Sequence, residues 1–205
     1  MRTTCVLLTL TLSGSAALSQ TESEFLQTKC LSFSFDGFNL NALNGGIGGK
    51  IWTSDANAFT LTIAGSVSST KEDGNAQYTE QKQSQTYVRL QAGLEQHCNM
   101  ASGFSPYFAE GVFGSLQTYK YTYSAIPPST GSESKRVTNS VGIVVGFGVE
   151  YWLTKRISVG GQQLFQGSYQ FGSQNDGSST SQDRNTSGFS TSLGTSSLIL
   201  SIYFE

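Results

Sequence analysis

The 205-residue chain is poor in charge, and it has no long apolar run outside its first residues. Asp, Glu, Lys and Arg make up 13% of the residues, against about 25% in ordinary globular domains, and the formal net charge is -2. Without a basic surplus, the chain is not expected to bind nucleic acid. No later stretch supplies the ~20 consecutive apolar residues of a transmembrane helix, so no such helix is predicted.

Histidine and cysteine are also scarce. His97 is the only histidine, and the three cysteines form no CxxC or Cys/His spacing, so no metal site is predicted. Nucleophilic catalysis needs a base beside a serine, usually a histidine. His97 and Ser102 could form such a pair, but nothing else in the sequence supports a reaction. No catalytic residue is therefore assigned, and the protein is predicted not to be an enzyme.

The N-terminus has the three parts of a secretory signal peptide. Arg2 gives a basic start, an apolar run follows, and Ala17-Leu18-Ser19 is a small-residue cleavage site. We predict a signal peptide at residues 1–19, a polar periplasmic leader at residues 20–29 and one further domain at residues 30–205.

Export would place two cysteines, Cys30 and Cys98, in an oxidising compartment. There they could form a disulfide, provided that their Cα atoms come within about 7 Å of each other. The alternative, two free thiols, stays open at this point.

Glycine and alternating sequence are abundant. Between Val141 and Phe171, two long runs alternate with a period of two, with large apolar residues on one face and small, polar or charged residues on the other. Strands of this length exceed the usual 5 to 6 residues of soluble sheets and suffice to cross a membrane, which takes about 9 to 11 tilted residues. Similar alternation elsewhere gives eight predicted strands, at residues 31–36, 46–52, 59–68, 86–97, 106–123, 141–153, 157–171 and 193–205.

The connections between these strands also follow a pattern. Polar segments at residues 70–85, 125–140 and 172–192 are predicted to be long loops, and all three follow odd-numbered strands. The first of them could also extend its neighbouring strands beyond the membrane. Outer-membrane barrels have this arrangement, with short periplasmic turns and long outer loops. In lipid only a closed barrel pairs every strand amide. We therefore predict an all-β fold, an eight-stranded antiparallel up-and-down transmembrane β-barrel. A soluble lipocalin-like barrel, whose apolar face would point inward, is the alternative.

Four charged residues within the strands lie opposite the apolar face and are predicted to point into the lumen: Lys50, Arg89, Glu95 and Glu150. Because an unpaired charge is costly there, we expect them to pair with one another and with nearby glutamines. An eight-stranded barrel is only wide enough to be filled by side chains, so this network is predicted to be structural. A gated ion path is the alternative. The sequence does not decide whether Glu110 points into the lumen or outward, because it lies on the same side of its strand as the apolar Phe108.

Three sequence motifs carry a resemblance to a known family. GGIGGKIWTSDANAFTLTIAGSVSS, GFGVEYWLTKRISVGGQ and the closing SSLILSIYFE together resemble the outer-membrane β-barrel domain family, eight-stranded barrels of the OmpA/OmpX type that are often labelled porin family proteins. The resemblance covers residues 30–205. It implies a location in the outer membrane, contact with outer-membrane lipid, insertion by the barrel-assembly machinery and no cofactor.

The predicted function is that of a non-enzymatic, monomeric outer-membrane barrel with a side-chain-filled lumen. Such a barrel would act as a structural or surface-interaction protein, with a possible extracellular partner at the three predicted loops. The alternative is a narrow porin, or a carrier of a small or apolar ligand. Tyr119, Tyr121 and Tyr123 are predicted to lie at a membrane interface.

Overall fold

The computed structural model describes residues 29–36, 46–73, 78–98, 103–125, 132–175, 184–194 and 196–204. The predicted signal peptide and residues 20–28 of the predicted leader lie outside these ranges. Within them, no helix has the length and apolar character needed to cross a membrane. The described ranges contain nine strands: β1 (Lys29–Asp36), β2 (Gly46–Trp52), β3 (Asn57–Asp73), β4 (Tyr78–His97), β5 (Phe104–Ala125), β6 (Ser132–Thr154), β7 (Ile157–Asn175), β8 (Arg184–Ser192) and β9 (Ser196–Phe204).

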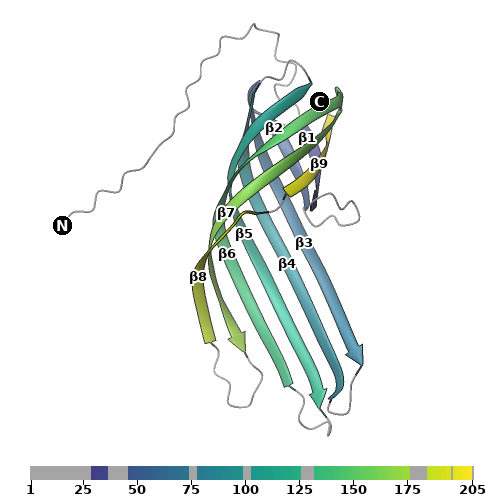
Figure 1. The fold of residues 1–205 in the computed structure, drawn as a ribbon, viewed down its shortest axis with the longest axis vertical. Coiled ribbons are helices and arrows are strands. Elements are labelled where there is room, and N and C mark those ends of the chain that lie inside the picture. The colour runs from purple at the N-terminus through teal and green to yellow at the C-terminus, as the bar shows by residue number, and fades with distance from the viewer. Residues whose placement is uncertain are drawn as a thin grey trace, which may run out of the picture.

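The strands form an antiparallel ring (Figure 1). From β1 to β7 each strand pairs with the next along the chain; β7 then pairs with β9, and β9 returns to pair with β1. The ring therefore contains eight strands, and the predicted all-β, up-and-down topology is confirmed.

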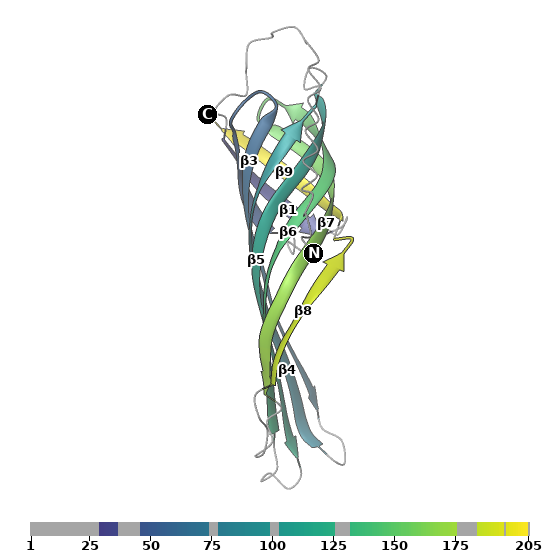
Figure 2. The ribbon, with the colours of Figure 1, turned by 90° about the vertical axis from the view of Figure 1, so that its left-hand side faces the viewer.

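The long strands extend well beyond the short ones that complete the ring. β1, β2 and β9 lie at the end of the molecule that carries the C-terminus, whereas β3 to β7 continue to the opposite end, which we call the far end (Figures 1 and 2). In β5 and β6 the strands reach 22 and 23 residues. The wall is thus complete only at the C-terminal end.

Two of the three predicted loops are mostly strand. The prediction of a loop was wrong for segment 125–140, whereas segment 70–85 extends its neighbouring strands, which the sequence had left open. β3 runs to Asp73 and β4 begins at Tyr78, while β5 runs to Ala125 and β6 begins at Ser132. The polar residues of segments 70–85 and 125–140 continue the ladders of their neighbours, as in the pair Lys71 and Lys82. A strand that is polar on both faces shows no apolar alternation, and its sequence therefore carries no signal for a strand.

The third predicted loop, residues 172–192, is also wrong. β7 extends to Asn175. Its part nearer the far end pairs with β8, and its part nearer the C-terminal end pairs with β9. Every residue of β8 is exposed. The last strand of the ring therefore begins at Ser196 rather than at residue 193, because the chain breaks its ladder between β8 and β9.

Gly194 and Gln163 accommodate that break. Gly194 has a φ of 65°, in the left-handed region that favours glycine. The side-chain amide of Gln163 donates to the carbonyl oxygens of Leu193, at 2.6 Å, and Leu164, at 3.2 Å. Carbonyl groups at an interrupted ladder are thereby satisfied by a side chain.

The two faces of the wall have opposite character. Ile143 is 61% exposed on the outside, whereas Lys50 is 5% exposed on the inside. Strand β2 shows the alternation directly, with Trp52 buried beside the exposed Ile51. The apolar residues predicted for one face of segment 141–153 do point outward. The alternative of a lipocalin-like barrel is therefore wrong, since its apolar face would have lined the interior.

In β5 this alternation settles two assignments. Glu110 is exposed and lies on the outer face with Phe108 and Val112, opposite Leu94 of β4. Tyr121 shares the inward parity of the buried Tyr107, and its hydroxyl donates to Gln81 at 2.9 Å. Tyr119 and Tyr121 therefore lie on the inner face rather than at an outer membrane interface. The side chain of Tyr123 lies outside the described part.

Candidate functional site

Lys50 lies between two buried glutamates in the lumen. Its Nζ atom is 2.6 Å from Oε2 of Glu95 and 2.9 Å from Oε2 of Glu150, and all three side chains are at most 8% exposed. The residues come from β2, β4 and β6. Because β2 and β6 are four places apart in a ring of eight, the ion pair of Lys50 with Glu150 joins opposite walls. Three of the four predicted network charges are thus brought together.

Further polar groups complete the hydrogen bonds of the two carboxylates. The hydroxyls of Ser158 and Tyr203 both donate to Oε1 of Glu150. Nε2 of His97 lies 3.1 Å from Oε2 of Glu95. A buried ion pair is stable only when such additional hydrogen bonds satisfy its remaining atoms, and this requirement is met here.

Aromatic rings surround the ion network. Lys50 Nζ lies 5.7 Å from the ring centres of both Trp52 and Tyr107, within the range of a cation–π contact. The His97 ring lies 4.5 Å from that of Trp52 and 4.8 Å from that of Tyr107. We call this layer the floor; its residues are Lys50, Trp52, Glu95, His97, Tyr107, Glu150, Trp152 and Tyr203.

Tyr107 fits into the floor because the facing residue is a glycine. A Cβ atom added to Gly148 would overlap the Tyr107 ring and its hydroxyl. Sequence reasoning considered His97 only as a partner of Ser102 and did not assign Tyr107 to the lumen. The alternation along β4 could have indicated the position of His97. It lies two residues after Glu95 and therefore points to the same side of the strand, into the lumen.

Arg89 does not join the other three predicted network charges. It lies on β4, six residues before Glu95, and donates from Nη1 to Gln166 and from Nη2 to Gln91, at 2.8 Å each. Its guanidinium carbon is 3.8 Å from the ring centre of Phe113. The predicted network is therefore two separate clusters, one in the floor and one nearer the far end.

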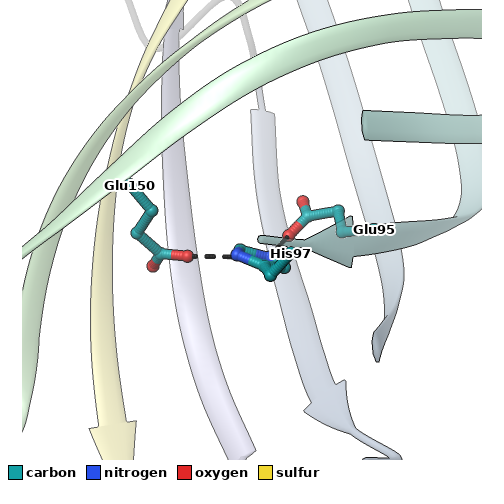
Figure 3. Close-up of side chains that lie close together, drawn as sticks. All are labelled: Glu95, His97 and Glu150. Carbon is teal, nitrogen blue, oxygen red and sulfur yellow. Dashed lines mark hydrogen bonds and ion pairs between the residues drawn. The ribbon is translucent and has the colours of Figure 1, made fainter. Parts of the chain in front are cut away.

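Glu95, His97 and Glu150 could in principle hold a metal ion, since their ligand atoms lie within 4.8 Å of one another (Figure 3). The ammonium group of Lys50, however, already lies within 3 Å of both carboxylates. Its positive charge occupies the position that favours a cation and repels a second one. The arrangement therefore gives no support for a metal centre.

His97 also links a serine to a carboxylate, in the order found in catalytic triads. Its Nδ1 is 3.0 Å from Oγ of Ser105, and its Nε2 faces Glu95. Ser105 is completely buried, however, and its hydroxyl donates to the carbonyl of Cys98 at 3.3 Å. No substrate can reach this oxygen, so the geometry does not support nucleophilic catalysis. Ser102, considered from the sequence, lies outside the described residues.

The two cysteines of the barrel are free thiols, so the disulfide considered between them is not formed. Cys30 is 3% exposed and packs in the lumen against Trp52, Ala58 and Tyr203. Cys98 is exposed and directly follows β4. One thiol thus points into the barrel while the other meets the surroundings.

A cavity of about 360 Å³ lies between the floor and the far end. Lys50 and Glu95 belong to its lining at one end, and Arg89, Gln91 and Gln166 line it farther along. Part of the remaining lining comes from residues with hydroxyl groups, namely Ser32, Ser34, Thr60, Thr62, Tyr87, Ser192 and Ser197. Another part is apolar and comes from Ala64, Ala109, Val144, Leu164 and Ile199. The lumen is therefore filled by side chains at the floor but not along its whole length.

Comparison with protein-family models and with curated protein sequences finds no match. Among solved structures, the fold is similar to a major outer membrane protein from Thermus thermophilus, which is 14% identical, with a TM-score of 0.52; the match covers 86% of this chain and 99% of that one. CarO from Acinetobacter baumannii is 10% identical, with a TM-score of 0.40 and coverage of 90% and 100% of the two chains. CarO2 from the same organism is 12% identical, with a TM-score of 0.39 and coverage of 86% and 97%.

At these identities the likeness shows the fold alone, and of these three structures the Thermus protein has a TM-score above 0.5. The chain has the fold of an outer-membrane β-barrel.

Proposed function

We propose that this chain is an outer-membrane barrel that is closed to solutes by its floor and that holds a polar sheet at the cell surface. The observation that carries the proposal is the buried ion network of Lys50, Glu95 and Glu150. Together with the surrounding rings it joins opposite walls of the lumen. A charged group held by two carboxylates is costly to displace, and a barrel of this size has little room for a path around it.

The surface of the barrel supports the proposed location. Large apolar side chains cover its outer face, which is the arrangement of a wall in contact with lipid. The outer-membrane origin of the Thermus protein and the predicted signal peptide support the same location. Lipid is then the main partner, and insertion as a monomer by the barrel-assembly machinery is part of the proposal.

The surface role is assigned to the far end. There β3 to β7 form a polar sheet that extends beyond the apolar band, which is the part of the outer face covered by large apolar side chains. Ladder pairing continues through this part, so the sheet is a rigid support rather than a set of flexible loops. The chain is proposed to be non-enzymatic and to act by presenting this sheet to an extracellular partner. The charged and hydroxyl-bearing residues in the lining of the cavity favour a second candidate function, the carriage of a small polar ligand.

Conductance measurements test the closed floor. Purified protein in planar bilayers is expected to show no stable open steps, whereas a triple variant, Lys50→Ala/Glu95→Ala/Glu150→Ala, is expected to show them if it still folds. Reproducible steps from the unaltered protein would contradict the proposal.

Protease treatment of intact cells tests the orientation. We expect cleavage at connections 74–77, 126–131 and 176–183, which join the strands at the far end, and protection of connections 53–56 and 155–156 until the cells are permeabilised. The reverse pattern, or protein recovered in the soluble fraction, would contradict the proposed location.

A further inference from the structure

The charge of Arg89 has no carboxylate partner among the described side chains. Its two hydrogen-bond acceptors, Gln91 and Gln166, are neutral amides. Glu95 points to the same side of β4, but it is about 20 Å farther along the strand at ~3.3 Å per residue, and it is already paired with Lys50. A half-buried guanidinium therefore faces the cavity with its charge uncompensated.

Arg89 also keeps free donors in a fixed orientation. A guanidinium has five N–H groups, and the bonds to the two glutamines use one from each of Nη1 and Nη2, which leaves three. The Phe113 ring stacks against one face of the guanidinium, at 3.8 Å, and thereby fixes its plane. Phe113 in turn occupies the space beside Gly142, where an added Cβ would lie 2.7 Å from the ring. A planar fork of N–H donors held in this way matches the two oxygens of a carboxylate or phosphate group.

The rest of the cavity sets the size and polarity of a ligand. Its volume of about 360 Å³ is at the lower end of the ~300–1,000 Å³ range of ligand pockets. Hydroxyls from Ser32 and Ser34 on β1 and from Thr60 and Thr62 on β3 line it. Each hydroxyl can both donate and accept a hydrogen bond, so this lining is suited to the hydroxyl groups of a ligand.

We propose that the cavity binds a small polyhydroxylated oxyanion, a sugar acid or a sugar phosphate, with the anionic group on Arg89 and the ligand hydroxyls on the serine and threonine side chains. Because the floor closes the C-terminal end, the ligand is held rather than passed through. Binding requires only the barrel interior, so it does not depend on whether the barrel conducts or on what its far end contacts.

Isothermal titration calorimetry of the full chain, folded in detergent micelles, tests this site. The ligands are gluconate, glucose 6-phosphate, inorganic phosphate and uncharged glucose. We expect gluconate or glucose 6-phosphate to bind at least ten-fold more tightly than glucose, and the tighter of the two identifies the anionic group. No binding of either anion at 20 mM, or equal affinity for glucose, would overturn the proposal. Inorganic phosphate binding as tightly as glucose 6-phosphate would overturn the role of the hydroxyls.

Variants locate the anion. Arg89→Gln should weaken binding at least ten-fold and Arg89→Lys by less, while Lys120→Gln, which removes an exposed cation elsewhere, should change nothing. A shift in electrophoretic mobility on heating checks that each variant is folded. Should Arg89→Gln fail to fold, Ser34→Phe fills the cavity from β1 and leaves Arg89 in place. Unchanged affinity in a folded Arg89→Gln or Ser34→Phe variant would show that the anion binds elsewhere and would overturn the proposal.

Discussion

Lys50 and Glu150 lie 100 positions apart in the chain, yet their side chains meet across the barrel, with Nζ 2.9 Å from Oε2. The two strands that carry them are on opposite sides of the ring, so this contact is not a consequence of strand pairing. Glu95, from the strand midway between them, completes the cluster. The three residues that fill the lumen at the floor thus also tie its walls together.

Lys50→Met should destabilise the barrel strongly. The substitution leaves two buried carboxylates without their cation, and breaking a buried pair in this way costs about 3–5 kcal/mol. Urea unfolding in lipid vesicles, followed by tryptophan fluorescence, measures the change, since Trp52 and Trp152 both lie in the floor. The matched control is Lys120→Met, which breaks a pair with Glu133 whose side chains are 47% and 51% exposed. Water screens that pair, and the expected loss is below about 1 kcal/mol.

Removing the partner charges should recover part of the loss. The triple variant Lys50→Met/Glu95→Gln/Glu150→Gln has no unpaired buried charge and is expected to be more stable than Lys50→Met alone. A triple variant as unstable as the single one would show that the side chain of Lys50 stabilises the floor by packing rather than by charge.

Gly148→Ala should destabilise the floor by overpacking. The added methyl group would overlap the Tyr107 ring, and such insertions typically cost about 1–3 kcal/mol. Gly167→Ala is the control in the neighbouring strand, because no atom lies within 4 Å of its added Cβ. Comparison of the two unfolding midpoints in urea checks this. Equal midpoints would mean that Tyr107 can move aside at no cost.

Glu110→Leu should stabilise the barrel in a bilayer. Glu110 faces outward among Leu94, Phe108, Val112 and Val145, and no described side chain pairs with it. A lipid-facing Lys or Arg costs about 2–4 kcal/mol at the bilayer midplane and a carboxylate less, so a gain of about 1–2 kcal/mol is expected. Glu72→Leu, near the far end, should change the free energy of unfolding by less than about 0.5 kcal/mol. A loss of stability in Glu110→Leu would instead indicate that the carboxylate has a partner in the membrane.

The two barrel thiols should differ sharply in reactivity. In a Cys5→Ala background, a maleimide should modify Cys98 in the folded protein and reach Cys30 only after unfolding, because Cys30 is 3% exposed. Mass spectrometry of the labelled peptides distinguishes the two sites. Rapid labelling of Cys30 in the folded state would show that the lumen near the floor is open to solutes.

The barrel itself could be predicted from the sequence, because large apolar residues alternate with small or polar ones along most strands of the ring. Parity alone placed Lys50, Glu95 and Glu150 in the lumen, and the structure brings them into contact. Parity does not give height along the barrel axis, however. For this reason Arg89 was assigned to the same network, although it lies six residues from Glu95 on the same strand.

Segments outside the apolar band could not be predicted in this way. There both faces of a strand are polar, as in β8, and the amino-acid pattern is that of a loop. What makes these segments strands is the continued pairing with long neighbours, a tertiary effect. Glu110 could not be assigned for a different reason. The faces were assigned on the rule that apolar residues point outward and charged residues inward, and Glu110 is a charged residue on the outer face.

The shortness of β1, β2 and β9 has a consequence for the dynamics of the barrel. The ladders on either side of β2 have six residue pairs each and those on either side of β9 have seven and eight, whereas the central strands pair over more than twice that length. Local opening costs least where the fewest hydrogen bonds must break together. The wall made by these three short strands, and β2 first of all, is therefore expected to exchange its amide protons before the rest of the ring, while the long strands remain protected and the molecule persists as a curved open sheet.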